Sequence, residues 1–411
     1  MPLTRSQVYR RRRVLVFGGI FALLAGIAYL PLTLLAPVED IDAIVTTPTI
    51  AAAAPAQLTL PTAAASAITA VGREGVLAQS GSTDPLPMAS ITKIVTALTV
   101  LDAHPLAADE PGPSVTMTSA DVALYRKYDG LGASVAPVAS GVAYTERELL
   151  EIMLIDSAGN YAITLGNWAF GSEEALLAAM RGWLAAHDLA GVTVTEPTGR
   201  DPGNQASAGD LLRLGELALT EPAIAQIVAT PSIEIHDVGV VKNSNTLLGD
   251  GGVDGIKTGT LNDFGANLLF SADLTVGAES VPLVGIVLGA ATHAQLNASV
   301  RELITQVQAG YHEVPLIAAG DRIGDYTTPW DTTATAIAAE PASIVVWGDT
   351  PITATAHVDD IRLADKGSPA GTITFTSGTQ TVDVPLVLSN AVEDPGPWWR
   401  LGHPEIIFGL D

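Results

Sequence analysis

A run of 22 residues without a charge, from Val14 to Leu35, constrains this chain more than any other feature. Four consecutive arginines, Arg10 to Arg13, come directly before it. A helix of this length covers about 33 Å, enough for a hydrocarbon core of about 30 Å. Because basic flanks stay in the cytoplasm, the pattern predicts a cytoplasmic basic tail at 1–13 and a transmembrane signal anchor at 14–36. The remainder would lie outside the cell membrane.

A cleaved signal peptide is the alternative interpretation of the same segment. The small residues at 51–54 and 63–65 could contain a cleavage site, and the protein would then be secreted. The apolar run is longer than the central part of an ordinary signal peptide, which favours the anchor.

The charge balance limits the classes of partner. The chain has 20 basic and 44 acidic residues, a formal charge of −24. Such an acidic surface repels phosphate backbones, so we expect no nucleic-acid partner. There is no cysteine, and the seven histidines show no metal-ligand spacing. The sequence therefore predicts neither a metal nor another cofactor.

The composition changes twice after the apolar run. Residues 37–60 are rich in Ala, Pro and Thr, which predicts a linker. Residues 61–312 mix short apolar strand patterns with longer amphipathic helices, typical of an α/β (α+β) domain. One of these helices should begin at Thr145, with Glu148 completing a capping box. Residues 313–411 alternate polar and apolar residues between turns, which predicts a small all-β domain.

Ser90 and Lys93 carry the first chemical signal. A spacing of three residues places a hydroxyl and an amine on one helix face, about one turn apart. A neutral lysine can take the proton of a serine nucleophile. Ser-x-x-Lys alone is weak evidence, since two solvated positions give the same pattern. Here Ile91, Val95 and Leu98 make the surroundings apolar, which favours a buried amine.

The second signal is Lys257-Thr258-Gly259-Thr260, on a predicted strand. Gly259 has no side chain, so a ligand can lie close to the backbone there. The chain has only five lysines, and two of them fall in these two motifs in this order. An exposed lysine at a strand edge is the alternative, and the pairing of the motifs weighs against it.

Together these residues resemble the serine D-alanyl-D-alanine carboxypeptidases, the low-molecular-mass penicillin-binding proteins. The resemblance covers roughly residues 61–312 and rests on six segments: Met88–Lys93, Leu149–Ala158, Pro197–Asp201, Ser207–Leu212, Gly255–Thr260 and Gly265–Ala272. It implies a penicillin-binding/β-lactamase-like transpeptidase fold, with a central antiparallel sheet and surrounding helices. A β-rich C-terminal domain after the catalytic domain also fits this family.

The resemblance implies a mechanism as well. Ser90 would attack the terminal D-Ala-D-Ala bond of a peptidoglycan stem pentapeptide, and Lys93 would be the general base. We expect burial and the charge of Lys257 to lower the pKa of Lys93. Ser157 would relay the proton, and the N–H groups of Ser90 and Thr260 would form the oxyanion hole. Lys257, Thr258 and Thr260 would hold the terminal carboxylate beside Gly259. A β-lactam would acylate Ser90 as a covalent inhibitor.

The middle motif departs from the family pattern. The family has Ser-x-Asn after a leucine-rich helix, whereas this chain has Ser157-Ala158-Gly159-Asn160. Gly159 occupies the position of the asparagine, and Asn160 comes one residue later. Either Asn160 turns into the site, or the site works without that amide, with weaker substrate positioning.

Two other functions fit parts of the same pattern. A β-lactamase of class A would share the outer motifs but needs a glutamate-based deacylation loop, and the segment around Glu196 lacks the Leu-Asn that would follow it. A weakly active or non-catalytic membrane-anchored peptidoglycan-binding homologue would keep the groove without turnover, and Gly159 supports it. The carboxypeptidase is the prediction that accounts for both motifs.

Overall fold

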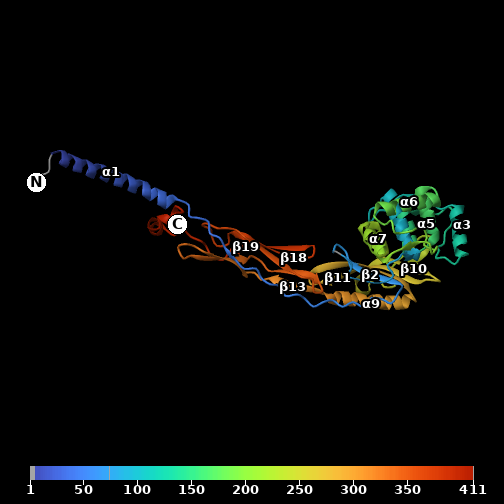
Figure 1. The fold of residues 1–411 in the computed structure, drawn as a ribbon. Coiled ribbons are helices and arrows are strands. Elements are labelled where there is room, and N and C mark those ends of the chain that lie inside the picture. Colours follow the sequence, from blue (N-terminus) through green and yellow to red (C-terminus); the bar gives the residue numbers. More distant parts are fainter. Residues whose placement is uncertain (1–4, 74, 411) are drawn as a thin grey trace. The chain divides into compact units, whose positions relative to one another are not determined.

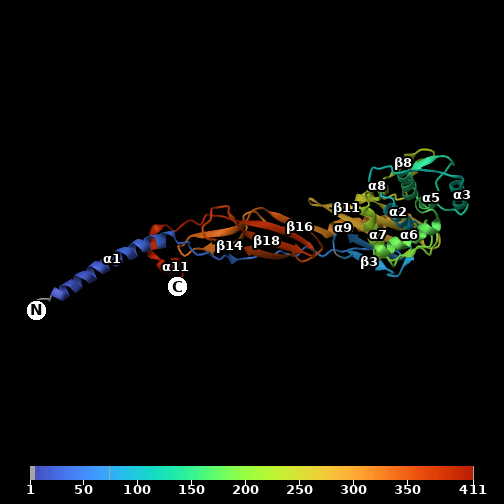
Figure 2. The same cartoon turned by 90° about the horizontal axis from the view of Figure 1, so that it is seen from above.

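The computed structural model describes residues 5–73 and 75–410 (Figures 1 and 2). The chain divides into two compact units. Unit 2 contains Ala54–His312, and unit 1 joins the residues up to Ala53 to those from Glu313 onward. The polypeptide therefore leaves unit 1 to build unit 2 and then returns.

Unit 2 is built on a five-stranded antiparallel sheet with the strand order β10-β11-β12-β2-β3. The sheet strands are β2 (Ala65–Ala70), β3 (Ala78–Gly81), β10 (Val253–Leu261), β11 (Gly265–Val276) and β12 (Glu279–Ala290). Strands β11 and β12 are nearly continuous apolar runs because helices cover both of their faces. Three separate two-stranded antiparallel sheets complete the strands: β4 (Leu86–Pro87) with β7 (Gln205–Ala206), β5 (Ser114–Thr116) with β6 (Ala143–Thr145), and the hairpin of β8 (Ser232–Ile235) with β9 (Gly239–Lys242).

The helices of unit 2 form a layer on each side of the sheet. They are α2 (Thr92–Ala103), α3 (Ser119–Asp129), α4 (Glu146–Ile155), α5 (Gly159–Phe170), α6 (Glu173–Ala186), α7 (Ala208–Thr220), α8 (Pro222–Val228) and α9 (His293–Gly310), with 3-10 turns η1 (Ala89–Ile91) and η2 (Asp250–Gly252). Helix α9 runs along one face, and the cluster containing α5, α6 and α7 lies on the other (Figure 1). Helix α7 approaches closely because Gly215 lies against Val284 and Leu269.

Local sequence signals explain where several of these helices begin. The capping box predicted at Thr145 is confirmed: its side chain accepts from the Glu148 N–H, and the Glu148 carboxylate accepts from the Thr145 N–H. The motifs beginning at Thr118 and Ser207 do the same for α3 and α7. These caps satisfy backbone donors that would otherwise be unpaired at the helix ends.

Unit 1 contains a six-stranded antiparallel sheet with the order β1-β14-β15-β19-β18-β17. Its elements are α1 (Arg5–Leu35), β1 (Ile44–Val45), β13 (Tyr311–Ile317), β14 (Arg322–Thr327), β15 (Thr333–Ala338), β16 (Ala342–Trp347), β17 (Thr353–Val358), β18 (Pro369–Ser377), β19 (Gln380–Leu388), α10 (Pro397–Gly402) and α11 (Pro404–Ile407). Strands β13 and β16 form a separate pair. Buried residues such as Tyr326, Ile373 and Phe375 form the core of this unit.

The segment expected as a linker at 37–60 differs from that expectation in its first part. Strand β1 pairs with β14, and the backbones of Ile41 and Ile361 exchange hydrogen bonds of 2.7 and 3.2 Å. Val38 and Ile41 are buried. Only one or two residues pair at each place, so the sequence shows no alternation of polar and apolar residues here. It therefore predicts a linker, although Ile44–Val45 is part of the sheet. At the other end of the anchor, the described part of the basic tail, residues 5–13, continues helix α1, while residues 1–4 lie outside the described residues.

Candidate active site

Ser90 and Lys93 meet as the spacing predicted. Ser90 lies in η1, one turn before the main body of α2, and Lys93 is in the first turn of that helix. The Lys93 Nζ is 3.0 Å from the Ser90 Oγ. Lys93 is 2% exposed, whereas Ser90 is partly exposed. The pair therefore has the geometry of a nucleophile and its base.

Two glycines hold the turn that presents Ser90. Ala89, the preceding residue, has a φ of 52°, a conformation that costs a residue with a Cβ about 1 kcal/mol or more. A Cβ on Gly199 would lie 1.9 Å from the Ala89 carbonyl oxygen. A Cβ on Gly259 would lie 2.9 Å from the Ala89 Cβ and 3.2 Å from the Ser90 nitrogen. The close approach of β10 to the serine turn therefore requires glycine at position 259, because any side chain there would collide with Ala89.

A loop at 195–204 supplies the second contact of Lys93. The Lys93 Nζ donates to the backbone carbonyl of Thr198 over 2.6 Å. Glu196 holds this loop, because one carboxylate oxygen accepts from the Thr198 N–H (2.8 Å) and hydroxyl (2.6 Å). Its other oxygen accepts from the Arg200 N–H and the Asn204 amide, both over 2.7 Å. Glu196 therefore acts through Thr198 on the position of the Lys93 amine.

Burial lowers the pKa of Lys93 to about 8, while the Glu196 carboxylate acts in the opposite direction. Burial and, after it, repulsion from the Lys93 amine place the pKa of Lys257 well below its usual range. The same repulsion disfavours a charge on Lys93 whenever Lys257 is charged. Because both amines are buried near each other, at most one of them readily carries a charge in the free site.

Strand β10 places the Lys257 motif beside η1. Lys257 is 1% exposed, and its Nζ donates to the Thr258 carbonyl over 3.3 Å. The Thr258 hydroxyl is 2.6 Å from the Ser244 hydroxyl. Thr260 is exposed, and its hydroxyl is 2.7 Å from the His293 Nε2. The four motif residues thus lie on the strand that packs against the serine turn, and they bring two hydroxyls and an amine to it.

His293 is a site residue that the sequence did not indicate. It begins α9, 33 residues after its partner Thr260. Burial and the nearby Lys257 lower its pKa, which favours the neutral imidazole. A lone histidine after a Thr N-cap carries no motif, and only the packing of α9 against β11 and β12 brings it here.

The residues of the middle motif, Ser157 to Asn160, lie in different surroundings. Ser157 lies between α4 and α5 with a φ of 64° and is 7% exposed. The Asn160 amide is buried, and its two ends bond the carbonyl and N–H of Ala136 over 3.0 and 3.1 Å. Asn160 therefore clamps a neighbouring loop and does not turn toward Lys93. Gly159 stands where the family motif has its asparagine. A side chain at this position would contact Thr198, whose carbonyl accepts the hydrogen bond from Lys93.

No group of three or more His, Cys, Asp or Glu residues with metal-binding geometry occurs in the described part of the chain. The polar side chains gathered around Ser90 and β10 are hydroxyls, amines and one imidazole. A serine that is paired with a buried lysine beside a Lys-Thr-Gly strand, on a sheet of this order, is the arrangement of motifs shared by β-lactamases and penicillin-binding proteins.

Comparison with known proteins places the chain more narrowly. A family model described as D-alanyl-D-alanine carboxypeptidase matches residues 51–292, more than half of the chain, and the chain belongs to this family. It is 31% identical to the D-alanyl-D-alanine carboxypeptidase DacC of Escherichia coli, over 53% of this chain and 54% of that protein. It is 25% identical to DacD of Salmonella typhimurium, over 57% of this chain and 60% of that protein. The matched region thus spans little more than half of these relatives.

Solved structures share the fold. Penicillin binding protein 6B from Escherichia coli superposes with a TM-score of 0.59 at 21% identity, covering 83% of this chain and all of that one. The peptidoglycan synthesis regulatory factor PBP3 from Streptococcus pneumoniae also gives 0.59, at 20% identity, covering 81% of this chain and all of that one. The coverage extends past unit 2, so the β-rich module is also common to this fold.

Proposed function

We propose that this protein is a serine-type D-alanyl-D-alanine carboxypeptidase that removes the terminal D-Ala from peptidoglycan stem pentapeptides. The observation that carries the proposal is the 3.0 Å pairing of the Ser90 hydroxyl with a buried lysine whose pKa is about 8. Family membership supplies the substrate class. Because the match covers only part of the curated relatives, the substrate and the reaction are proposals for this chain.

The first half-reaction forms an acyl-enzyme. The neutral amine of Lys93 takes the proton as the Ser90 Oγ attacks the carbonyl of the terminal peptide bond. The N–H groups of Ser90 and Thr260 stabilise the oxyanion, since the Gly259 contact brings β10 against the serine turn. Ser157 passes the proton to the leaving D-Ala amine. The peptide is then esterified to Ser90, and water attacks this ester in the second half-reaction.

Substrate recognition falls to Lys257, Thr258 and Thr260. The terminal carboxylate of the peptide brings a negative charge beside the Lys257 amine and so favours its charged form. The hydroxyls of Thr258 and Thr260 donate to the carboxylate oxygens. A β-lactam presents a similarly placed carboxylate and a strained amide, so it should acylate Ser90 and block the enzyme.

Labelling with a fluorescent penicillin tests this function directly. The full chain in detergent should retain a covalent label, and Ser90→Ala should not. Lys257→Ala serves as a second variant that leaves the nucleophile in place but should slow labelling. Release of D-Ala from a pentapeptide then distinguishes a carboxypeptidase from a slow β-lactamase. If wild type neither labels nor releases D-Ala, the non-catalytic alternative replaces the proposal.

The structure offers less support for a class A β-lactamase. Such an enzyme needs a glutamate that activates the deacylating water, and Glu196 is the candidate in the corresponding loop. Both oxygens of its carboxylate accept hydrogen bonds from the loop itself. Glu196 is thus committed to holding the loop, and the acyl-enzyme formed with a β-lactam should be long-lived.

We further propose that α1 is a retained membrane anchor, with its arginine-rich end in the cytoplasm, and with unit 2 and the β-sheet of unit 1 outside. Helix α1 is long and apolar enough to cross a bilayer, and none of its most apolar window is buried. A cleavage at 51–54 would detach β1 and the buried Val38 and Ile41 from unit 1. The intact mass of the protein extracted from membranes tests this: an uncleaved chain is expected, and a chain beginning after residue 51 would show a processed signal peptide.

A further inference from the structure

We propose that Pro397–Leu410, here called the collar, docks on the outer end of α1 and lies in the interfacial layer of the membrane, so that unit 1 is held at the lipid surface at two points. The inference rests on the proposed anchor. Its starting point is that several large apolar side chains of the collar are exposed and belong to no hydrophobic core.

The collar contacts the membrane-spanning helix directly. The Tyr29 hydroxyl donates to the Leu401 carbonyl over 2.8 Å, and the Arg400 guanidinium donates to the Ala36 carbonyl over 2.6 Å. Tyr29 lies six residues before the last residue of α1, or about 9 Å along the axis. Helix α10 therefore lies beside the last turns of α1. At this level a spanning helix passes from hydrocarbon into headgroups.

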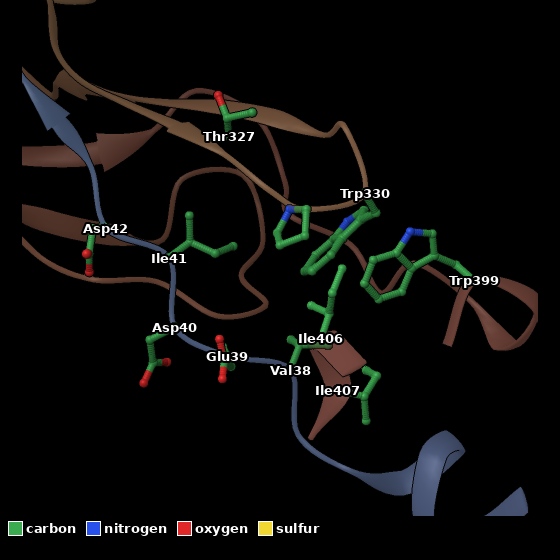
Figure 3. A pocket seen from close by; sticks show the side chains of 11 residues that line it. Val38, Glu39, Asp40, Ile41, Asp42, Thr327, Trp330, Trp399, Ile406 and Ile407 are labelled. Atoms are coloured by element: carbon green, nitrogen blue, oxygen red, sulfur yellow. The ribbon is translucent and has the colours of Figure 1, made fainter. Parts of the chain in front are cut away.

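The inner side of the collar contacts the rest of unit 1. Trp399 meets Trp330 edge-on with the ring centres 5.4 Å apart, and both rings, together with Ile406 and Ile407, line a cavity of about 280 Å³ (Figure 3). Arg400 is 6% exposed and forms an ion pair with Asp394. The collar is thus a fixed part of unit 1, with its one buried cation neutralised.

Other large apolar side chains of the collar are exposed. Trp398 is 86% exposed, Leu410 is 74% exposed and Phe408 is 42% exposed. These are the exposed large hydrophobic residues of the collar in the described part of the chain. Tryptophan is favoured where one side of a side chain is apolar and the other is wet, and it is enriched at membrane interfaces. A set of such residues beside the end of a spanning helix matches a lipid surface better than it matches water.

Lipid is the occupant that the contacts favour. The hydrogen bonds to Tyr29 and Ala36 fix the collar to the helix that enters the bilayer, so any membrane that contains α1 reaches the collar. The neighbouring acidic residues Glu39 and Glu405 give no attraction to anionic lipid headgroups. The contact should therefore depend on apolar insertion and change little with salt or with the anionic lipid fraction.

Depth-dependent fluorescence quenching tests the collar in the full chain. The protein is reconstituted into liposomes whose lipids carry bromine either near the headgroup end or near the methyl end of the acyl chains. Lipid brominated near the headgroup should quench part of the tryptophan emission, and Trp398→Phe should remove most of that quenched part. Trp183→Phe, at a buried position in α6 of unit 2, is the matched control and should leave the quenched part unchanged.

Each other outcome overturns the proposal. Equal quenching in wild type and Trp398→Phe would place this side chain in water. A concentration-dependent blue shift in detergent that Trp398→Phe abolishes would show a second copy covering the collar. A cleaved chain would remove the collar's docking partner together with the anchor. Penicillin labelling of Ser90 is followed in every variant, so a failure of the collar remains distinguishable from a failure of the enzyme.

Discussion

The side chain of Lys93 donates a 2.6 Å hydrogen bond to the backbone carbonyl of Thr198 while its nitrogen lies 3.0 Å from the Ser90 hydroxyl. A neutral amine has two N–H groups and one lone pair. When one N–H is committed to Thr198, the rotation of the amine is restricted and the lone pair can point to the serine proton. The loop at 195–204 thus contributes to the base without offering a side chain to it.

The rate of acylation should follow the titration of Lys93. Its pKa is about 8, and only the neutral form can accept the Ser90 proton. The second-order rate constant for acylation by a penicillin should rise by about tenfold per pH unit below pH 8 and level off above it. Stopped-flow labelling across about pH 6 to pH 10 measures this, with Ser90→Ala as the background. A profile that stays flat through this range would exclude Lys93 as the base.

Glu196→Gln should shift that profile to lower pH. The Glu196 carboxylate raises the pKa of Lys93, so its removal should lower the pKa further. The amide would also face N–H donors, leaving at least one unpaired, and the free energy of unfolding should fall by about 1–3 kcal/mol. The acylation profile and a denaturation curve measure the two effects.

The exposed Glu174 provides the control for that variant. Glu174→Gln should change neither the profile nor the denaturation midpoint, because it lies on α6 away from the loop. A Glu196→Gln enzyme that lost stability but kept the wild-type profile would show that Glu196 supports the loop alone.

The two motifs that carry the chemistry were readable in the sequence because their spacings are local. One helical turn brings Lys93 to Ser90. Side chains alternate between the two faces of a strand, so Thr258 and Thr260, two residues apart, point to the same face. The apolar neighbours Ile91, Val95 and Leu98 are all buried, as expected for a base that must lose its charge. The capping box at Thr145 is local in the same way.

The contributions that the sequence hid are long-range or belong to the backbone. Thr198 acts through its carbonyl, which any residue possesses, and it lies 105 residues from Lys93. His293 reaches Thr260 only through the packing of α9 on the sheet. Asn160 looked like a displaced catalytic amide, but its two hydrogen bonds to Ala136 depend on a loop whose course no local pattern indicates.

Gly199→Ala should nearly abolish acylation. The added Cβ would lie 1.9 Å from the Ala89 carbonyl oxygen, so the serine turn or the loop would have to move. Misplacement by about 1 Å can cost about 10²-fold in rate. Gly171 is a matched control because its φ of 86° resembles the 80° of Gly199, yet nothing lies within 4 Å of its Cβ position. Gly171→Ala should lose stability from backbone strain but label at the wild-type rate. Similar labelling rates in the two variants would contradict the role of the contact.

His293→Ala should weaken substrate binding more than turnover. His293 orients the Thr260 hydroxyl, which we propose to donate to the substrate carboxylate. Losing an oriented hydrogen bond to a charged group costs about 1.5–3 kcal/mol, so KM for a pentapeptide should rise about tenfold or more, with a smaller change in kcat. His357→Ala, at an exposed position in unit 1, is the control. A change confined to kcat would instead assign His293 to the proton transfers.

Gly159→Asn should accelerate acylation, because it restores an amide at the position where the family motif has one. A Cβ at Gly159 would meet the Ser134 carbonyl oxygen and the Thr198 side chain at 3.5 Å, which is ordinary contact distance, so the fold should accept a side chain there. An amide in this place could bond the Lys93 amine or the substrate, and one well-placed polar group in such a site is worth about 10²-fold. Gly159→Ala is the control, since it adds the Cβ without the amide and should label at the wild-type rate. Labelling rates for wild type, Gly159→Ala and Gly159→Asn decide the question. An asparagine variant no faster than the alanine variant would mean that the Thr198 carbonyl already supplies what the amide would add.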